Sequence, residues 1–398
     1  MAKSRIVKTI FRNIFRPHAD SALEPVEQLK EALEKYFALR VFPVNSGRSG
    51  LYLILKSAGI GKGDEVIIQA YTCNAVPNPI IWTGAKPVYA DINPETLNVD
   101  PNEVEKKITD KTKAIILQHT FGRPGSIQEL SDLARKHDLL LIEDCAHALG
   151  AKYNGKKLGT FGDAAILSFG REKVISSLTG GAILMRNSNL IKPILNNVSQ
   201  LPPMTIKRTS QEFLNFFAWR LLLRRIYFNE TGHKFIRRLN NYDFFNVVTA
   251  EKEKVGERPA WYPAAMPSVL ASVALEEFEQ LDKYNKARGE IAQYYYENIQ
   301  NSDFRLLPSH EGIYLRVVAL HKKALQVLAE ARKRKYWFGN WYNAPIYPNG
   351  VNEEKLGYIR GTCPNAELAA EQTINLPNYL GMGLEEVKEV VEFVNNFE

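Results

Sequence analysis

Between about residues 40 and 190, short apolar runs that end in small or polar residues alternate with segments of helical periodicity. This alternation is typical of repeated βα units and predicts an α/β fold, a mostly parallel sheet flanked by helices. The predicted strands are Glu65–Ala70, Pro87–Asp91, Ala114–His119, Leu139–Glu143, Ala165–Phe169 and Gly181–Met185. The predicted helices are Gly50–Ala58, Ala75–Thr83, Asn102–Ile108 and Ser126–His137, with a helical turn at Cys145–Leu149.

The alternation stops after Asn187, and residues 188–260 form an irregular aromatic and basic stretch. A long amphipathic helix is then predicted from Pro267 to about Tyr294. Beyond it the pattern is α+β, with a strand near 313–320 and helices over 322–332 and 384–397. We therefore expect an N-terminal segment (1–40) made of a basic amphipathic helix and a lead-in helix, followed by a large domain (41–265) with a divergent insertion (188–260). A linking helix with a small C-terminal domain (266–398) completes the chain.

The composition is that of an ordinary globular protein, with 398 residues, 45% hydrophobic and 24% charged. These values exclude disordered, collagen-like and disulfide-scaffold classes. Three scattered cysteines without CxxC spacing indicate a reducing compartment and argue against a zinc-finger site, and no metal site is predicted. The chain has no apolar run of about 18 residues and no signal-peptide pattern, so we expect a cytoplasmic protein.

The net charge of +7 comes from two segments. The first 16 residues carry five basic side chains and no acid, and residues 204–240 carry eight basic and two acidic side chains. Removing these +5 and +6 contributions leaves the rest of the chain at −4. Both segments also carry long apolar side chains, so they suit an anionic membrane surface or packing against protein, including a dimer interface. A nucleic-acid groove fits them less well.

In an open α/β sheet, ligands bind at the carboxyl ends of the strands. The candidate residues there are Asn45 to Gly50, His119, Glu143, Asp144, His147, Ser168 and Lys173. Each has an ordinary structural reading: Asp144 suits a helix N-cap as well as a ligand, and Lys173 alone would be a surface charge. Together they could hold a phosphate, an aromatic cation and an amine nucleophile.

Three stretches change that balance: Leu141-Ile-Glu-Asp-Cys-Ala-His-Ala-Leu-Gly150, Lys157-Leu-Gly-Thr-Phe-Gly-Asp163 and Ser168-Phe-Gly-Arg-Glu-Lys173. Supporting matches are Asn45-Ser-Gly47, His119-Thr-Phe-Gly-Arg-Pro124, Cys363-Pro-Asn-Ala-Glu367 and Asn375-Leu-Pro377. In this order they resemble the DegT/StrS-type sugar aminotransferases, which are fold-type I enzymes that use pyridoxal 5′-phosphate. The resemblance covers about residues 40–190 and 260–395.

The resemblance implies a role for each matched residue. Lys173 is the Schiff-base lysine and proton carrier, Asp144 pairs with the pyridine nitrogen, and His147 lies near the phenolic oxygen of the cofactor. The expected phosphate contacts are Ser46, Gly47, Arg48 and Ser168. Arg48 stands where the family usually has Thr, and its guanidinium is a competent phosphate partner.

Two further positions differ from the family pattern. Cys73 replaces the usual stacking aromatic, which leaves Tyr71 as a substitute. The stretch Trp261-Tyr-Pro-Ala-Ala-Met266 replaces the Asn-Tyr-Arg segment that family members extend across their dimer interface. The contribution of a partner subunit in the implied homodimer is therefore different or absent.

By this resemblance the chain transfers an amino group, with glutamate as donor, to a nucleotide-linked keto-sugar. The two basic segments suggest that it works beside the membrane, on a sugar bound for a cell-surface polysaccharide. Two alternatives stay open: a pyridoxal-phosphate-dependent sugar dehydratase, which the retained Lys173 disfavours, and a non-catalytic binding or regulatory protein. A metal site of His119, His147 and Asp144 ranks last, because the cofactor reading already uses two of these residues.

Overall fold

A computed structural model describes residues 23–223, 226–229, 231–232, 249–307 and 311–398. Its main sheet has seven strands in the order β1-β10-β9-β6-β5-β2-β4. They are β1 (Arg40–Val44), β2 (Glu65–Gln69), β4 (Lys86–Ala90), β5 (Thr112–Gln118), β6 (Leu140–Asp144), β9 (Ala164–Ser168) and β10 (Gly181–Met185). Strands β4, β2, β5, β6 and β9 run parallel, and β10 runs antiparallel to β9. Strand β1 is antiparallel to β10 and therefore runs in the same direction as β9. The predicted α/β fold with a mostly parallel sheet is confirmed.

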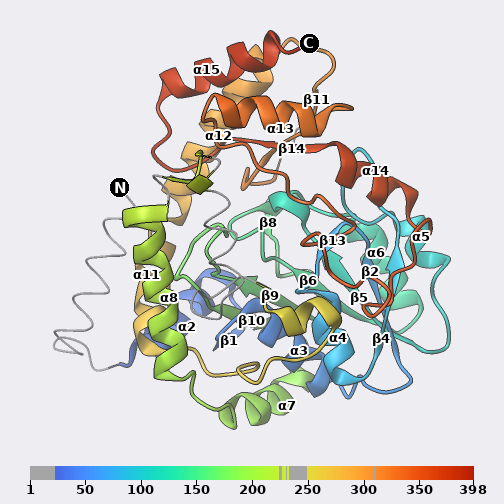
Figure 1. Ribbon diagram of the computed structural model, residues 1–398. Coiled ribbons are helices and arrows are strands. Elements are labelled where there is room, and N and C mark those ends of the chain that lie inside the picture. Colours follow the sequence, from blue (N-terminus) through green and yellow to red (C-terminus); the bar gives the residue numbers. More distant parts are fainter. Residues whose placement is uncertain (1–22, 224–225, 230, 233–248, 308–310) are drawn as a thin grey trace.

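Helices cover both faces of the main sheet (Figure 1). Side chains of β5 alternate between two apolar cores, with Ile116 in one and Ile115 in the other, as expected for a strand buried on both sides. The first core includes α3 (Gly47–Ser57), α4 (Pro77–Thr83) and α7 (Ser188–Ser199). The second includes α2 (Pro25–Phe37), α5 (Pro101–Glu105), α6 (Ile127–Lys136) and α11 (Ser268–Phe278).

A smaller antiparallel sheet, β11-β12-β14, lies above the main sheet (Figure 1). Its strands are β11 (Arg305–Leu306), β12 (Val317–Leu320) and β14 (Thr373–Leu376). It shares a separate core with α12 (Leu281–Asn298), α13 (Ala324–Lys333) and α15 (Leu384–Asn395). This is the expected α+β pattern of the C-terminal part, whereas the exact domain boundaries stay predictions.

A short pairing joins the two parts of the molecule. Strand β13 (Ile346–Tyr347) runs parallel to β3 (Thr72–Cys73), and the Thr72 N–H donates to the carbonyl of Pro345 at 2.9 Å. Further elements are a small hairpin of β7 (Lys152–Tyr153) and β8 (Lys156–Lys157), the helix α14 (Pro364–Gln372), and the 3-10 turns η1 (Thr120–Gly122) and η3 (Glu251–Val255). The pairing holds residues 345–347 beside β3, which follows the carboxyl end of β2.

Three sequence predictions need correction. Strand β1 was not predicted, because Arg40–Val44 contains Pro43; proline is tolerated here because β1 is an edge strand. The single helix from Pro267 is two helices, α11 and α12, broken at Glu279 and Gln280. The apolar periodicity does not reveal this two-residue break, because the helices on both sides of it bury apolar side chains against the protein.

The stretch after Asn187 is not irregular throughout. It forms α7, α8 (Ile206–Ala218) and one π-helical turn, η2 (Trp219–Leu223). The side chains of Asn187 and Thr205 cap the first two helices by accepting backbone N–H groups. The N-terminal basic amphipathic helix predicted over the first 16 residues lies outside the described residues, as do the basic residues at 224–225 and 233–240.

Candidate active site

The carboxyl ends of β5, β6 and β9 lie side by side. In the sheet register Asp144 pairs with Gln118 of β5 and with Ile166 of β9, two residues before Ser168. His147 follows in the turn after β6, and Lys173 lies in the loop between β9 and β10. The carboxyl ends of the parallel strands, where the sequence predicts a ligand site, therefore bring the candidate residues together.

Asp144 has one carboxylate oxygen with a hydrogen bond and one without. Its Oδ1 accepts the Ala146 N–H at 2.9 Å, and within the described residues no donor reaches the other oxygen. Burial raises the pKa of this carboxyl, and the hydrogen bond from Ala146 and the charge of Lys173 only partly offset that effect. A buried carboxylate with a free oxygen suits a cationic N–H donor such as a pyridinium.

His147 is held in one tautomer by its backbone contact. Its Nδ1 accepts the Phe121 N–H at 3.3 Å, so the ring proton lies on Nε2. The imidazole stacks on Phe121 at 5.9 Å and on Trp341 at 5.5 Å between ring centroids. Burial, together with the charges of Lys173 and Arg316, holds the pKa of His147 well below its usual value, so the ring is neutral.

Lys173 lies against the same indole. Its Nζ is 5.5 Å from the centroid of the Trp341 ring. Burial lowers the pKa of Lys173, whereas Cys73 and Asp144 act in the opposite direction. A lysine whose charged form is disfavoured supplies a neutral amine more readily than an exposed lysine does.

The N-terminus of α3 forms a cradle beside these groups. A Cβ added at Gly47 would come within 3.2 Å of the Cβ of Ser168, so glycine allows the two segments to approach closely. A Cβ added at Gly170 would lie 3.7 Å from both the Ser168 hydroxyl and the Cγ of Lys173. A helix N-terminus beside a hydroxyl suits a phosphate, so this region fits a phosphorylated cofactor.

Two of the predicted phosphate contacts have other partners. The hydroxyl of Ser46 caps α3 by accepting the Ser49 N–H at 3.1 Å. The Arg48 guanidinium forms an ion pair with the buried carboxylate of Glu253. Burial opposes the charge of Arg48, but Glu253 outweighs it and raises the pKa of the guanidinium. The side chain of Arg48 is therefore engaged with η3.

The side chain of Tyr71 is fully buried, and its hydroxyl is bound to residues of the C-terminal part of the chain. Its O–H donates to the Thr373 hydroxyl at 2.6 Å, because the proton of that hydroxyl is directed to the carbonyl of Ala369. Its oxygen accepts the Tyr342 N–H at 3.2 Å. The aromatic ring that faces both His147 and Lys173 is Trp341, which the sequence reasoning missed.

Trp341 and Arg316 both come from the C-terminal part of the chain. The guanidinium carbon of Arg316 lies 4.6 Å from the centroid of the Trp341 ring. The signal that could have found Trp341 is the density of aromatic residues in Tyr336-Trp-Phe-Gly-Asn-Trp-Tyr342. No sequence signal distinguished Arg316 from the other basic residues.

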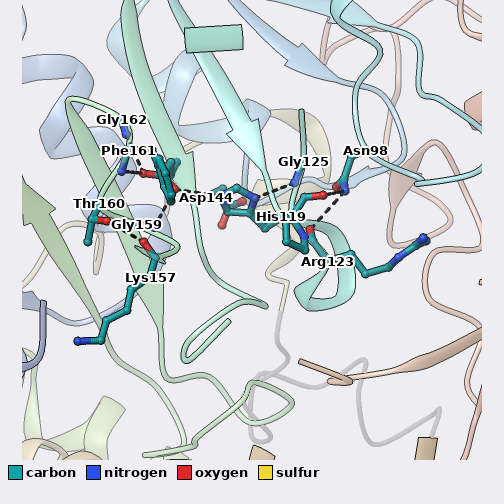
Figure 2. A network of polar contacts seen from close by, with 12 residues as sticks. Asn98, His119, Arg123, Gly125, Asp144, Lys157, Gly159, Thr160, Phe161 and Gly162 are labelled. Carbon is teal, nitrogen blue, oxygen red and sulfur yellow. Dashed lines mark hydrogen bonds and ion pairs between the residues drawn. The ribbon is translucent and has the colours of Figure 1, made fainter. Parts of the chain in front are cut away.

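Behind the site, Glu143 and His119 form a satisfied buried network. Figure 2 labels His119, Gly125 and the glycine-rich loop residues of this network. Glu143 accepts three backbone N–H groups, from Gly159, Phe161 and Gly162, each at 2.7 Å. The Gly125 N–H donates to His119 Nδ1 at 3.1 Å, so Nε2 donates to Glu143 at 3.1 Å. Burial opposes ionisation of Glu143, but these hydrogen bonds outweigh it and keep its pKa below the usual value.

The same network bears on metal binding. In the described part of the chain, His119, Glu143 and Cys145 form the group whose ligand atoms lie close enough to share an ion. Both ring nitrogens of His119 and both carboxylate oxygens of Glu143 already have hydrogen-bond partners. The hydrogen bonds of Glu143 and His119 therefore support a structural role, in which they hold the ends of β5 and β6 to the neighbouring loops.

Comparison with known proteins gives a consistent picture. The sequence pattern of the DegT/DnrJ/EryC1/StrS aminotransferase family matches residues 21–213 and 229–395. A GDP-perosamine synthase of Vibrio cholerae is 29% identical over 89% of this chain and 85% of its own. The spore coat polysaccharide biosynthesis protein SpsC of Bacillus subtilis is 29% identical over 92% and 88%. The putative sugar aminotransferase Spr1654 of Streptococcus pneumoniae, in its PLP form, superimposes with a TM-score of 0.74, 21% identity and coverage of 98% and 95%.

Proposed function

The chain belongs to the DegT/DnrJ/EryC1/StrS aminotransferase family and is a pyridoxal-phosphate-dependent sugar aminotransferase, and we propose that it transfers an amino group from glutamate to a nucleotide-linked keto-sugar. The observation that carries this proposal is the convergence of Lys173, Asp144 and His147 at the ends of β6 and β9. The sugar and donor follow from resemblance, and a relative named GDP-perosamine synthase supports a nucleotide sugar.

The residues present fit the cofactor. We assign Asp144 to the pyridine nitrogen, because its second oxygen has no donor within the described residues. The Nε2–H of His147 would donate to the phenolic oxygen, since Nδ1 is already an acceptor. Ser168 and the α3 N-terminus at Gly47 would hold the phosphate. Ser46 supports this cradle as the N-cap, Arg48 contributes its backbone, and Tyr71 supports the base of the site.

When bound, pyridoxal phosphate supplies an electron sink for the carbon that loses a proton. The ionised carboxylate of Asp144 favours a protonated ring nitrogen and so maintains that capacity. The amine of Lys173 would hold the cofactor and, when free, would accept the proton that the substrate carbon loses and return it at the cofactor's C4′. Its lowered pKa increases the fraction of neutral amine that can accept this proton.

Substitution of Lys173 tests this assignment. The purified wild type should show cofactor absorbance near the edge of the visible range, and Lys173→Ala should lose the covalently attached fraction and the activity. Lys192→Ala, at an exposed position on α7, is the control and should retain both. An unchanged spectrum in Lys173→Ala would show that another residue carries the cofactor.

Half-reactions separate aminotransfer from the dehydratase alternative. L-glutamate should convert the holoenzyme to its aminated form, and a nucleotide keto-sugar should reverse the change with formation of an amino sugar. A product that has lost one hydroxyl oxygen and gained no nitrogen would identify a dehydratase. The test also covers the non-catalytic alternative, which predicts no spectral change with either compound.

We also propose a homodimer as the working form. The residues Trp261 to Met266, which replace the family's cross-subunit segment, contact their own chain: Tyr262 stacks on Trp82 at 5.9 Å, and Arg208 lies over Trp261 at 4.5 Å. The site of each subunit would then depend less on its partner. Light scattering should give twice the 45.1 kDa of one chain, and a monomer that keeps full activity would contradict the proposal.

The outward face of α8 and η2 supports a contact with an anionic membrane surface. Ile206 is 86% exposed and Leu221 is 64% exposed, and the exposed cations Lys207 and Arg220 lie beside them in the sequence. Within the described residues, no helix has the length and apolar character needed to cross a bilayer. A surface contact therefore fits better than insertion of one of these helices.

Vesicle co-sedimentation tests this contact. The intact protein should sediment with vesicles of anionic phospholipid and less with neutral ones, and Ile206→Ser with Leu221→Ser should reduce the bound fraction. A variant lacking residues 1–17 measures how much the N-terminal segment contributes to vesicle binding. Absence of binding by the intact protein contradicts the membrane contact, and loss of dimer in the double variant would assign the face to a subunit interface.

A further inference from the structure

Arg316 is a cation beside the candidate active site that the assigned chemistry does not use. It directly precedes β12, its side chain is 27% exposed, and its guanidinium carbon lies 4.6 Å from the centroid of the Trp341 ring. The opposing acid is Glu172, whose Oε2 is 3.5 Å from Nη2. Among the described residues no other acceptor binds this guanidinium. Most of its N–H donors therefore lack a protein partner.

Arg171, by contrast with Arg316, is paired with a buried carboxylate. Arg171 donates to the carboxylate of Glu212 at 2.7 Å, and the side chain of Glu212 is only 5% exposed. Glu172, by contrast, is 55% exposed and meets Arg316 at the outer limit of a hydrogen bond. An exposed pair of this kind contributes little, so an incoming carboxylate can displace Glu172 at small cost.

The position of Arg316 relative to Lys173 is fixed by buried contacts. Arg288 of α12 donates to the carbonyl of Val174, next to Lys173, at 2.7 Å. The Nδ2 of Asn378 donates to the carbonyl of Arg288 at 3.2 Å and to the carbonyl of Tyr314 at 2.8 Å. These bonds connect the two segments through α12, so the amine and the guanidinium lie on one indole ring in a defined arrangement.

We propose that Arg316 binds the carboxylate of the amino donor, with the Trp341 ring as the platform between Arg316 and Lys173. An amino acid donor carries a carboxylate next to the amino group that must meet the cofactor held by Lys173. A guanidinium can form two parallel hydrogen bonds with a carboxylate, and an indole face attracts the cation. This inference rests on the proposed role of Lys173 and deepens it by naming a residue that selects the donor.

Titration of the holoenzyme with L-glutamate tests the proposal. The concentration that half-saturates the loss of cofactor absorbance should rise about tenfold or more in Arg316→Gln, as expected for a lost charged hydrogen bond. Arg316→Lys should give a smaller rise, because it keeps the charge without the fork. Arg305→Gln is the matched control, since Arg305 is bound to Glu95 and Pro94 on the surface.

A second measurement does not depend on turnover. Glutarate, a dicarboxylate without an amino group, should change the tryptophan fluorescence of the wild type with and without cofactor. Trp341→Phe should remove this signal, and Arg316→Gln should weaken glutarate binding about tenfold. If the wild type carries no cofactor at all, the proposed function fails, whereas the glutarate titration still decides the role of Arg316.

Two results would overturn the proposal. The first is unchanged half-saturation by L-glutamate and unchanged glutarate affinity in both Arg316 variants. The second is a loss of affinity for UDP, dTDP or GDP by calorimetry while glutamate binding is kept, which would assign Arg316 to the diphosphate of the sugar substrate. Unchanged nucleotide affinity together with weaker glutamate binding supports the carboxylate role.

Discussion

Asn375 holds the backbone of Trp341 through both ends of its side-chain amide. Its Oδ1 accepts the Trp341 N–H at 2.9 Å, and its Nδ2 donates to the Trp341 carbonyl at 3.1 Å. Gly339 adds two backbone hydrogen bonds to Asn375, and a Cβ at Gly339 would come within 3.0 Å of Asn375 Oδ1. The ring that faces His147 and Lys173 is therefore oriented by an asparagine of β14.

Substitution of Asn375 should loosen this ring. Asn375→Ala removes the partner of the Trp341 N–H and leaves the Trp341 carbonyl with only the 3.5 Å contact from the Tyr71 hydroxyl, so we expect the free energy of unfolding to fall by about 1–3 kcal/mol. Turnover should fall as well, because Trp341 loses its fixed orientation. Urea denaturation and steady-state kinetics measure the two effects.

The control is Asn301→Ala, which removes bonds to the carbonyls of Val394 and Phe397 far from Trp341. It should lower stability but leave turnover per folded molecule unchanged. Equal losses of turnover in the two variants would argue against a positioning role for Asn375.

Replacing Asp144 should separate stability from cofactor binding. Burial raises the pKa of this carboxyl in the folded protein, so its ionisation near pH 7 costs stability when no cation is bound. Asp144→Asn removes that cost, and the cofactor-free variant should melt at or above the wild-type temperature. Saturating cofactor stabilises the wild type by about 2.7 kcal/mol at a hundredfold excess over Kd, and the variant should gain much less. Calorimetry with and without pyridoxal phosphate measures both; an equal gain would remove Asp144 from the cofactor site.

The neutral state of His147 predicts a pH dependence of stability. Because its folded pKa lies well below that of the unfolded chain, its contribution is complete above pH about 6.5 and is lost as the pH falls. The wild type without cofactor should lose about 1.4 kcal/mol per pH unit below that point from this residue. His147→Asn should show a shallower slope in denaturant midpoints between pH 7 and 5. Identical slopes would mean that other groups dominate.

Glu143 should be a strong determinant of stability without touching the substrate. Glu143→Gln places an amide N–H against one of its backbone donors and weakens the hydrogen bond from His119, so we expect a loss of about 3 kcal/mol or more. Glu105→Gln, an exposed partner of Lys136, should leave stability close to that of the wild type. Equilibrium unfolding measures both variants, and a small effect at Glu143 would show that water replaces the buried contacts.

The amino-acid sequence by itself determined the parallel strands from β2 to β9 and the residues at their carboxyl ends. Apolar runs and the turns between them are local signals. They suffice to place Asp144, His147, Ser168 and Lys173 at or just after the carboxyl ends of the strands. The break between α11 and α12 and the edge strand β1 escaped that reasoning, because a two-residue break and a proline at a sheet edge leave the local pattern unchanged or misleading.

Only the tertiary structure decided which side chains meet across long sequence separations. It paired Arg48 with Glu253, bound the Tyr71 hydroxyl to Thr373, and brought Trp341 and Arg316 to Lys173. These choices depend on the pairing of β13 with β3 and on the amide of Asn375. Local periodicity carries no information about such partners, because the free energy that selects them comes from burial and hydrogen bonding between distant segments.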